Sequence, residues 1–239
     1  MIYVIISDVH ANLEAVDACF NRIDEINPDH IICLGDLVDY CAEPNEVVEI
    51  IKSRCDAVVL GNHDEAQFNY SLSEGFSENA QISSRYTRTI INPVYVEYFR
   101  SLPLTHSEEG LLFVHSSPAV SGKYKYVLTD ENAMINFKSF KEKICFIGHS
   151  HIPLIFEESE NSARIVTHDG LRNDRRYIIN VGSVGQPRDN NPRLCFGVFD
   201  SEKFEFRYER TDYDIKKASE KITAEKLPAK LAKRLFEGI

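Results

Sequence analysis

The sequence lacks the features that mark several common classes of protein. No run approaches the ~18 apolar residues of a membrane-spanning helix. The apolar stretch at residues 2–6 is too short for the core of a signal peptide and has no basic residues before it. The six cysteines lie far apart, without the close pairs of a zinc knuckle, so we interpret them as free thiols. These absences predict a cytoplasmic protein with no membrane-spanning segment.

The chain also lacks an excess of basic residues. It has 27 lysines and arginines against 37 aspartates and glutamates, which gives a formal net charge of −10. A protein that binds nucleic acid along its backbone needs a broad basic face, so bulk nucleic-acid binding is not expected. A small phosphorylated substrate is compatible with this charge, because bound metal cations reverse the local sign.

The sequence does contain a regular alternation of apolar strands and amphipathic helices in its first part. We predict strands at residues 3–6, 30–34 and 57–60. One helix follows a cap at Asn12, and a second, over residues 44–53, has proline in its first turn. This βαβαβ order predicts an α/β fold with a largely parallel, covered sheet.

The remainder of the chain changes character twice. Helices are predicted over residues 79–90, 92–99 and 130–140, and strands over 111–115 and 144–147. Beyond residue 152 strands dominate, at 154–156, 164–167, 177–180, 195–199 and 204–208, before a helical segment broken at Pro228. We predict one domain over residues 1–239, with a helical insert at about 65–103 and a C-terminal helical tail at about 212–239. The lysine-rich face of that tail is interpreted as solvated surface.

Metal-type side chains follow each of the first three predicted strands. Asp8 and His10 come after the first strand, two residues apart, so both point to the same side of extended chain. Asp36 follows the second strand and Asn62 the third. In open α/β sheets, ligands bind at the carboxyl ends of the strands. Carboxylate oxygen together with imidazole nitrogen suits borderline divalent metals, namely Mn, Fe, Ni or Zn.

The second half of the chain supplies further nitrogen donors in the same pattern. His115 follows one predicted strand, and His149 and His151 follow the next. The two-residue spacing allows the last pair to bind one ion or two ions. The histidines outside these strand ends, to which we assign no role in a site, are His30, His106 and His168.

These clusters resemble the motif set of the calcineurin-like metallophosphoesterases. The segments that carry the resemblance are Asp8-Val9-His10, Gly35-Asp36, Gly61-Asn62-His63-Asp64, His115 and Gly148-His149-Ser150-His151. Residues 12–15, 44–48 and 180–188 extend the likeness and are similar to the small bacterial and archaeal phosphodiesterase-type branch. Together the motifs cover most of the chain and are highly specific.

The resemblance implies a fold and a metal centre. The fold is a four-layer αββα sandwich, in which two facing mixed β-sheets are flanked by helices. Two divalent metal ions are implied, and manganese is favoured. The first ion would be held by Asp8, His10, Asp36 and His151. Asp36 would bridge to the second ion, whose other ligands would be Asn62, His115 and His149.

The resemblance also implies a reaction, the hydrolysis of a phosphoester bond. A metal-bridging hydroxide is the expected nucleophile, since a metal lowers the pKa of a bound water to about 7. His63 is the predicted general acid for the leaving oxygen, because it adjoins a metal ligand without being one. Asp39 is the predicted partner that orients His63 and keeps it protonated.

One departure from the family narrows the substrate. Serine/threonine protein phosphatases of this superfamily have an arginine after the aspartate that corresponds to Asp39, whereas Tyr40 stands here. This difference argues against a dedicated phosphoprotein phosphatase. The candidates for substrate contact are the cations Arg188, Lys123 and Lys125 and the rings of Tyr124 and Tyr126, on which a base could stack. The alternative for each of them is a solvated loop.

Three functions stay open at this point. The leading prediction is a phosphodiesterase or phosphatase that acts on a small phosphorylated or nucleotide substrate. The alternative enzyme is a nucleotide pyrophosphohydrolase, such as a symmetrical diadenosine tetraphosphate hydrolase. A catalytically inactive scaffold is the alternative outside enzymes, but such relatives lose ligands or the acid histidine, and here all are present. The sequence does not name the substrate, the native metal or the oligomeric state.

Overall fold

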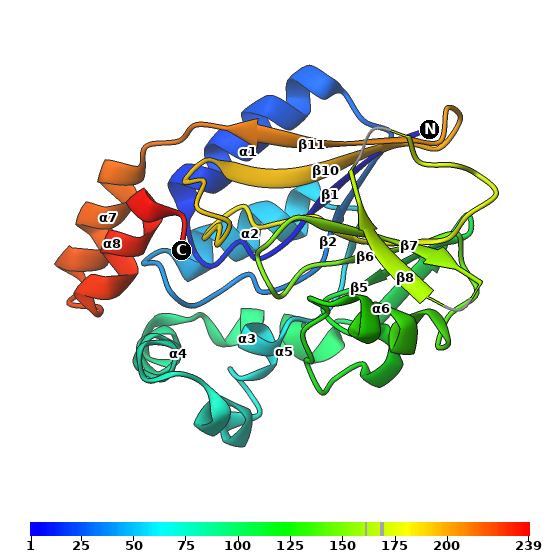
Figure 1. Cartoon of the computed structure of the whole chain (residues 1–239). Coiled ribbons are helices and arrows are strands. Elements are labelled where there is room, and N and C mark those ends of the chain that lie inside the picture. Colours follow the sequence, from blue (N-terminus) through cyan, green and yellow to red (C-terminus); the bar gives the residue numbers. More distant parts are fainter. Residues whose placement is uncertain (161, 168–169) are drawn as a thin grey trace.

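The computed structural model describes residues 1–160, 162–167 and 170–239, and within these ranges two β-sheets lie face to face (Figure 1). The strands of the first sheet are β1 (Ile2–Ile6), β2 (His30–Cys33), β3 (Ala57–Val58), β10 (Leu194–Asp200) and β11 (Glu205–Thr211). Those of the second are β4 (Thr105–Glu108), β5 (Leu111–Val114), β6 (Ile144–Ile147), β7 (Leu154–Ser159), β8 (Ser162–Val166) and β9 (Tyr177–Asn180).

Both sheets are mixed, and each has a parallel centre. The first sheet has the order β11-β10-β1-β2-β3, in which β1, β2 and β3 are parallel and β10 and β11 are antiparallel additions. The second has the order β4-β5-β6-β9-β7-β8, with β5, β6 and β9 parallel. The predicted βαβαβ unit is therefore confirmed, and its parallel strands all end toward the same edge.

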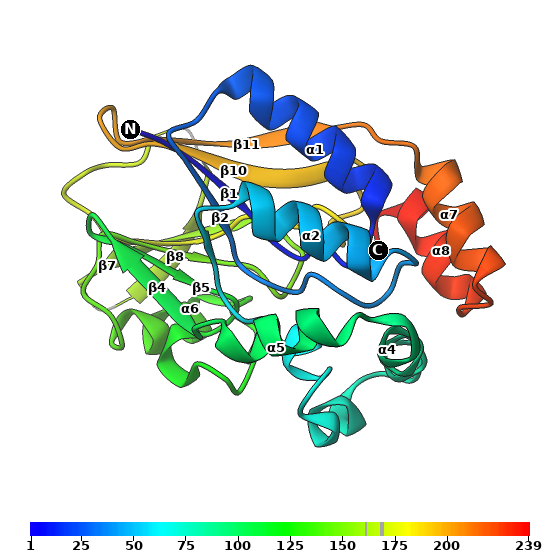
Figure 2. The same ribbon diagram turned by 180° about the vertical axis from the view of Figure 1, so that it is seen from behind.

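Helices cover the outer faces of the two sheets, which makes the predicted four-layer sandwich. The first sheet is covered by α1 (Leu13–Ile26) and α2 (Pro44–Arg54), both in front of it in Figure 2. The second is covered by α6 (Asp130–Phe137). Helix α1 begins where predicted, because the Asn12 side chain accepts a hydrogen bond from the Ala15 main-chain nitrogen at 3.2 Å.

Strand alternation separates the core into layers. In β1, the side chains of Val4 and Ile6 pack with those of α1 and α2, whereas Tyr3 and Ile5 point between the two sheets. The inner layer is completed by aromatic side chains of the second sheet, such as Phe146. A strand buried on both faces must be apolar throughout, which is why β1 reads as a continuous apolar run.

The remaining helices lie at the ends and edges of the sandwich. They are α3 (Asn62–Glu65), η1 (Tyr70–Gly75), α4 (Glu78–Ile90), α5 (Pro93–Ser101), η2 (Pro118–Val120), α7 (Ile215–Ala224) and α8 (Ala229–Glu237). Helices α4, α7 and α8 lie at one end, on the left in Figure 1. Leu231 and Leu235 of α8 pack with Ile222 of α7 and with Tyr40 in a cluster of their own. No helix of the described ranges is long and apolar enough to cross a membrane.

Several predicted boundaries need correction. Strand β3 stops at Val58 rather than at residue 60, because the Leu60 main-chain nitrogen donates to the Pro103 main-chain oxygen at 2.8 Å instead of to β2. Helix α6 ends at Phe137 rather than at residue 140, and β8 spans 162–166 rather than 164–167. The polar strand β4 and the 3₁₀ turns were missed, since neither has a clear apolar period.

Candidate metal centre

The predicted metal and acid residues meet at one edge of the sandwich, in loops that follow β1, β2, β5 and β6 and in the short helix α3 after β3. All nine side chains are at most 9% exposed; they are Asp8, His10, Asp36, Asp39, Asn62, His63, His115, His149 and His151. Buried polar groups need partners or an ion, because their desolvation is costly. Their convergence follows from the parallel strands, which all deliver their carboxyl ends to this edge.

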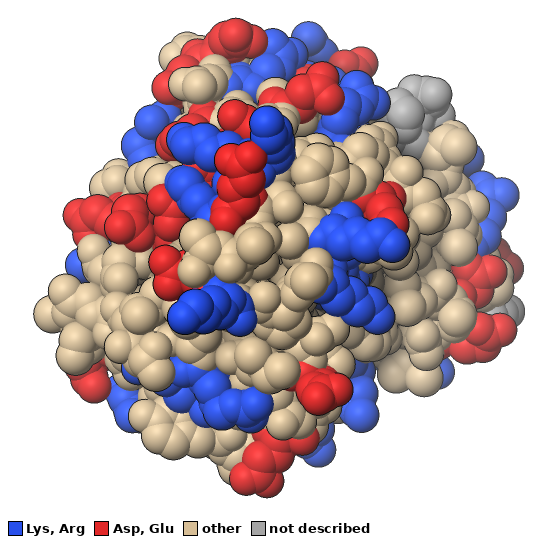
Figure 3. Space-filling model, turned by 90° about the vertical axis from the view of Figure 1, so that its left-hand side faces the viewer, with Lys and Arg blue, Asp and Glu red and all other residues tan. Residues whose placement is uncertain are grey.

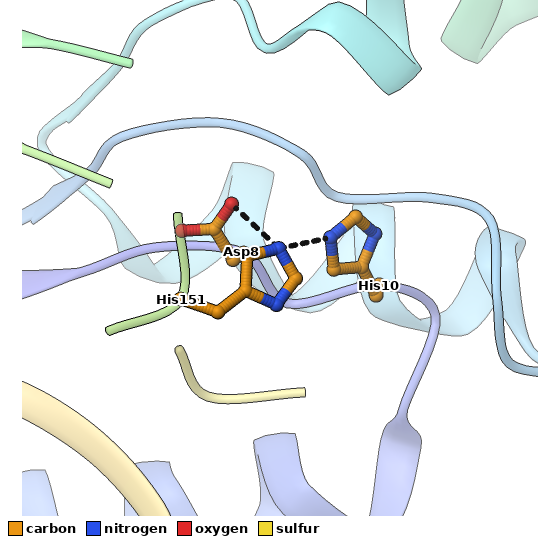
Figure 4. Close-up of side chains that lie close together, drawn as sticks. All are labelled: Asp8, His10 and His151. Carbon is orange, nitrogen blue, oxygen red and sulfur yellow. Dashed lines mark hydrogen bonds and ion pairs between the residues drawn. The ribbon is translucent and has the colours of Figure 1, made fainter. Parts of the chain in front are cut away.

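Asp8, His10 and His151 form the first of two clusters (Figure 4). The Nε2 atom of His151 lies between the other two side chains, 3.3 Å from Asp8 Oδ1 and 3.1 Å from His10 Nε2. The potential ligand atoms of this cluster all lie within 4.8 Å of one another. Each side chain offers one atom toward a common point.

Asp36, His115 and His149 form the second cluster, and Asn62 adjoins it. His115 Nε2 lies 3.2 Å from Asp36 Oδ2 and 3.1 Å from Asn62 Oδ1. The same Asp36 Oδ2 atom lies 3.8 Å from His10 Nε2 in the first cluster. The Asp36 carboxylate therefore stands between the two clusters, the position that a bridging ligand needs.

Main-chain carbonyl groups fix which nitrogen of each histidine is free. The Nδ1–H groups of His10, His115 and His151 donate to main-chain oxygens at 2.9, 2.8 and 2.6 Å. In His149 the Nε2–H group donates instead, to the Tyr124 main-chain oxygen at 3.0 Å. A carbonyl oxygen only accepts, so the other nitrogen of each neutral ring keeps its lone pair for an ion.

The donor set fits cations and little else. With their Nδ1 atoms protonated, neutral His10 and His151 direct two lone pairs at each other across 3.1 Å, beside the Asp8 carboxylate. In the second cluster, Asp36 and Asn62 direct oxygen atoms at His115 Nε2. Acceptor atoms that converge without a proton between them repel one another unless a cation lies among them.

The electrostatics of the histidines agree with that interpretation. Burial lowers the pKa of His149 to about 3 and that of His10 well below its usual range, which leaves both rings neutral. His115 differs: burial lowers its pKa, but the Asp36 carboxylate outweighs this effect and raises the pKa to about 9. A dication on Asp36 would supply the positive charge that this proton supplies otherwise.

The backbone around the clusters is held in an unusual conformation. Six of the site residues have a positive φ: Asp8 (53°), His10 (51°), Asp36 (55°), Asp39 (71°), His149 (66°) and His151 (61°). Such a conformation costs about 1–3 kcal/mol for each non-glycine residue and persists where the surrounding structure over-determines it. The strain is concentrated where the ligand atoms are aimed.

Two glycines of the motifs allow the loops to approach so closely. A Cβ atom on Gly148 would lie 1.9 Å from Ser7 Oγ and 2.6 Å from Asp8 Oδ2, and one on Gly61 would lie 2.3 Å from Asp36 Oδ1. Asp64 clamps the same loops, because its carboxylate accepts from the main-chain nitrogens of Asp36 and Leu37, both at 2.8 Å. The sequence places Asp64 in a motif but does not predict that its carboxylate holds these loops together.

His63 lies beside the clusters and belongs to neither of them. Its Nδ1 atom is 2.7 Å from Asp39 Oδ2, and the other Asp39 oxygen accepts from Gln67 Nε2 at 3.1 Å. Burial opposes protonation, but Tyr40 and the carboxylates of Asp36 and Asp39 raise the pKa of His63 to about 10. The arrangement keeps a proton on His63 and holds the orientation of its ring. Gln67 has no signal of its own in the sequence.

The structure places the predicted substrate-contact residues in two different situations. Tyr126 is half exposed, and its ring stacks on that of His149 with centroids 4.4 Å apart. Tyr124 is partly buried, and its hydroxyl donates to Glu65 at 2.5 Å, so it supports the loop. The Arg188 guanidinium lies 5.7 Å from the centre of the Tyr40 ring.

A cavity of about 890 Å³ opens directly onto this centre. Asp36, Asn62, His63, His149 and His151 form part of its floor. Its cationic lining consists of Lys123, Lys125, Arg188, Lys230 and Arg234. Apart from Asp36, its acidic lining within the described residues is Glu78. The lining thus has the opposite balance to the whole chain, whose formal net charge is −10.

The other histidines stand apart from this centre. His30 lies 3.9 Å from Asp56, and His106 lies 3.0 Å from Glu108, both outside the clusters as expected. His168 falls outside the described residues.

Comparison with known proteins decides the family. The profile of the calcineurin-like phosphoesterase superfamily domain matches residues 1–203, which include every residue of the two clusters. The chain belongs to the calcineurin-like phosphoesterase superfamily. Members of this superfamily have a dinuclear divalent metal centre, and the two clusters are the candidate for it in this chain.

Two full-length relatives of this calcineurin-like phosphoesterase come from an archaeon and a bacterium. It is 37% identical over 242 residues to "Uncharacterized protein MJ0912" of Methanocaldococcus jannaschii, which covers 98% of this chain and 97% of that protein. The crystal structure of a metallophosphoesterase from Sphaerobacter thermophilus superposes with a TM-score of 0.87 at 33% identity, covering 100% of this chain and 99% of that one.

A further solved structure has the same fold at much lower sequence identity. Hypothetical protein PH1004 from Pyrococcus horikoshii OT3 has a TM-score of 0.83 at 19% identity, covering 100% of this chain and 98% of that one. At that identity the likeness shows the fold alone. In these relatives the match extends over the C-terminal helices as well as the sandwich, since nearly the whole of each chain is covered.

Proposed function

We propose that this protein is a hydrolase of phosphoester bonds that depends on two divalent metal ions and acts on small phosphorylated substrates. The observation that supports it best is the pair of buried clusters that share the Asp36 carboxylate. The ligands of the first ion would be Asp8, His10, Asp36 and His151, and those of the second would be Asp36, Asn62, His115 and His149. The donor atoms of His149 and of the other histidines follow from the tautomers described above.

The charge of the centre explains how an acidic protein can bind an anion. Two dications carry four positive charges, and the Asp8 and Asp36 carboxylates neutralise two of them. Burial raises the pKa of both carboxylates, but the neighbouring histidines lower it by more in the metal-free site, and bound dications would keep both carboxylates ionised. When bound, the ions would activate a water and hold the oxygens of the phosphoryl group.

His63 is the proposed proton donor to the leaving oxygen. Its Nδ1 atom is held by Asp39, which leaves Nε2 as the atom that transfers a proton, and the side chain lines the cavity. Asp39 is the proposed positioning residue, fixed in turn by Gln67. A proton donor of this kind accelerates loss of a poor leaving group by about 10²–10⁴-fold.

Manganese is the proposed native metal among Mn, Fe, Ni and Zn. The set of two histidines per ion, with carboxylate and amide oxygens, is of intermediate hardness and accepts any of these four. Availability in the cell then selects among them. We further propose that the chain works as a single domain in the cytoplasm, which agrees with its six free thiols.

A substrate panel on metal-loaded protein tests this proposal. Protein stripped by a chelator is reconstituted separately with Mn, Fe, Ni, Zn or Mg and assayed on bis-p-nitrophenyl phosphate, p-nitrophenyl phosphate and diadenosine tetraphosphate. We expect at least one of the three substrates to be hydrolysed, and we expect that hydrolysis to require two equivalents of metal per chain. Binding of two ions without hydrolysis of any of the three would sink the proposal and favour a scaffold.

A further inference from the structure

The C-terminal helix α8, which sequence reasoning assigned to solvated surface, reaches the cavity. Lys230 and Arg234 of α8 line it together with Arg188, which lies in the loop after β9. We refer to Arg188, Lys230 and Arg234 as the distal basic cluster. Figure 3 shows the face of the molecule that carries α4, α7 and α8 in Figure 1, and blue side chains lie on opposite sides of its middle.

Among the described residues, the distal basic cluster has no Asp or Glu partner, in contrast to other cations of the tail. Elsewhere on the tail, Lys221 is paired with Glu14 and Glu43, and Lys233 lies 3.4 Å from Glu237. Within the described ranges, no Asp or Glu side chain forms an ion pair with a member of the distal basic cluster; Arg188 Nη2 donates to Gln186 Oε1 at 3.1 Å, and Arg234 Nε donates to the Ile239 main-chain oxygen. These three cations thus have no Asp or Glu counter-charge on this wall of the cavity.

The two arginines are close enough to feel each other's charge. Burial lowers the pKa of Arg234, and the neighbouring Arg188 guanidinium lowers it further. Arginine keeps its proton in proteins, so the repulsion is retained rather than relieved by titration. The Nε atom of Arg188 is buried and has no hydrogen-bond partner among the described residues. An anion between the two guanidinium groups would relieve the repulsion and provide that partner.

The cluster adjoins the metal centre without being part of it. The Arg188 main-chain nitrogen donates to the His151 main-chain oxygen at 3.2 Å, so the loop that carries Arg188 is tied to a proposed ligand of the first ion. The Arg188 side chain lies over the ring of Tyr40, and Tyr40 packs against His10 and His63. Arg188 therefore spans the space between the centre and α8.

We propose that the distal basic cluster binds a second phosphate group of the substrate, so that the preferred substrates are nucleotide-sized phosphoesters with a further phosphate beyond the scissile one. This inference rests on the proposed function, because the scissile phosphate is taken to lie at the two clusters. The cavity of about 890 Å³ has room for such a molecule. Two fixed guanidinium groups and an ammonium suit a phosphate, which accepts several charge-assisted hydrogen bonds.

A pair of chromogenic diesters tests the proposal. Thymidine 5′-(p-nitrophenyl phosphate) and its 3′-phosphorylated derivative release the same phenol and differ by one phosphate. We expect metal-loaded wild type to prefer the 3′-phosphorylated ester in kcat/KM by about 10–100-fold, the equivalent of one to two charge-assisted hydrogen bonds. Arg234→Gln should remove most of that preference, and Lys230→Gln a smaller part. Both changes should lower kcat/KM for the ester without the extra phosphate by a much smaller factor, so that the ratio of the two kcat/KM values falls.

Lys233→Gln is the matched control, because it removes a charge from the same helix outside the cavity lining. It should leave the preference intact. Thermal melting checks that each variant folds. If Arg234→Gln is unstable, Lys230→Gln alone tests the proposal, because Lys230 is at an exposed position. A preference that survives both cavity variants, or no preference in wild type, overturns the proposal.

A binding measurement separates this proposal from the proposed function. Alkane diphosphonates of two to six carbons and the matching alkyl monophosphonates, none of which can be hydrolysed, are titrated calorimetrically into metal-loaded protein. Wild type and Lys233→Gln should bind one diphosphonate at least about tenfold more tightly than its monophosphonate, and Arg234→Gln should not. If no ester is cleaved but this difference appears, the proposed reaction is wrong and the anion site stands. Equal loss of diphosphonate affinity in Lys233→Gln and Arg234→Gln would show that affinity depends on general surface charge and not on the distal basic cluster. That result would overturn the proposal.

Discussion

The metal centre and the wall of the cavity above it differ in how far their side chains are buried and in the partners that hold them. At the centre, every side chain is buried, the backbone adopts positive φ values, and carbonyl groups fix the histidine tautomers. On the wall, Lys230 and Tyr126 are exposed, and within the described residues no Asp or Glu side chain pairs with the cations of the distal basic cluster. The contrast teaches that the fold over-determines the geometry of the candidate metal centre, whereas the selectivity that we propose would rest on a few peripheral side chains.

Loss of the Asp36 carboxylate should break the centre most severely. Asp36→Asn removes charge from the atom that lies between both clusters, so we expect metal content to fall from two ions and activity to fall by about 10³-fold or more. Metal analysis together with kcat/KM checks this. Asp17→Asn, at an exposed position of α1, is the control and should change neither. If Asp36→Asn kept both ions, Asp36 would not be the bridging ligand.

Removal of the proton donor should lower the rate without disturbing the metals. His63→Ala is expected to keep two ions and lose about 10²–10⁴-fold in kcat on an ester with a poor leaving group, and much less on a p-nitrophenyl ester. Asp39→Asn should have a weaker effect in the same direction, since it releases the ring that it positions. A fall in metal content alongside the rate would show that His63 is a ligand.

The close approach of the loops should make the centre intolerant of a single methyl group. Gly148→Ala places a Cβ atom on Ser7 and Asp8, so we expect a loss of about 1–3 kcal/mol in the free energy of unfolding. Denaturant unfolding measures it. Gly75→Ala is the matched control, because a Cβ atom there meets nothing within 4 Å and its φ is not positive. Equal stability of the two variants would contradict the tight packing of this loop.

The wall should show the smallest effects. Tyr126→Leu removes the exposed ring that stacks on His149, and we expect KM for a nucleotide ester to rise about three- to tenfold, as for the loss of one aromatic contact. The kcat value should stay within about twofold. Steady-state kinetics on the nucleotide ester and on methyl p-nitrophenyl phosphate provide the comparison. An unchanged KM for both esters would exclude Tyr126 as a platform for a base.

Much of the centre could be predicted from the sequence, because its residues sit where strands end. Apolar runs such as residues 3–6 predict buried strands, and a polar cluster directly after each run indicates the edge of the sheet where ligands bind. The resemblance to a family then assigned Asp36 and His63 different roles; in the structure Asp36 lies between the two clusters, and His63 lies beside them and pairs with Asp39. The supporting contacts were not predictable: Gln67 reaches Asp39 across a distance in sequence that no local pattern records.

The helical tail shows most clearly what a sequence pattern leaves undetermined. Its lysine-rich pattern is that of a solvated helix, and Lys233 conforms to it. Lys230, about one turn earlier, and Arg234, the next residue, line the cavity instead. Nothing in the periodicity of α8 distinguishes the two groups, since all are cations on polar positions.

The sequence by itself determined the strand order of the first βαβαβ unit, the residue types of the two clusters and the family. These properties depend on local apolar patterns and on short motifs, which are legible in one dimension. Only the tertiary structure decided that Asp36 stands between the clusters, that carbonyl groups select the free nitrogen of each histidine, and that α8 lines the cavity. The physical reason is that these contacts join residues far apart in the chain, and their geometry is set by how the two sheets and the tail pack.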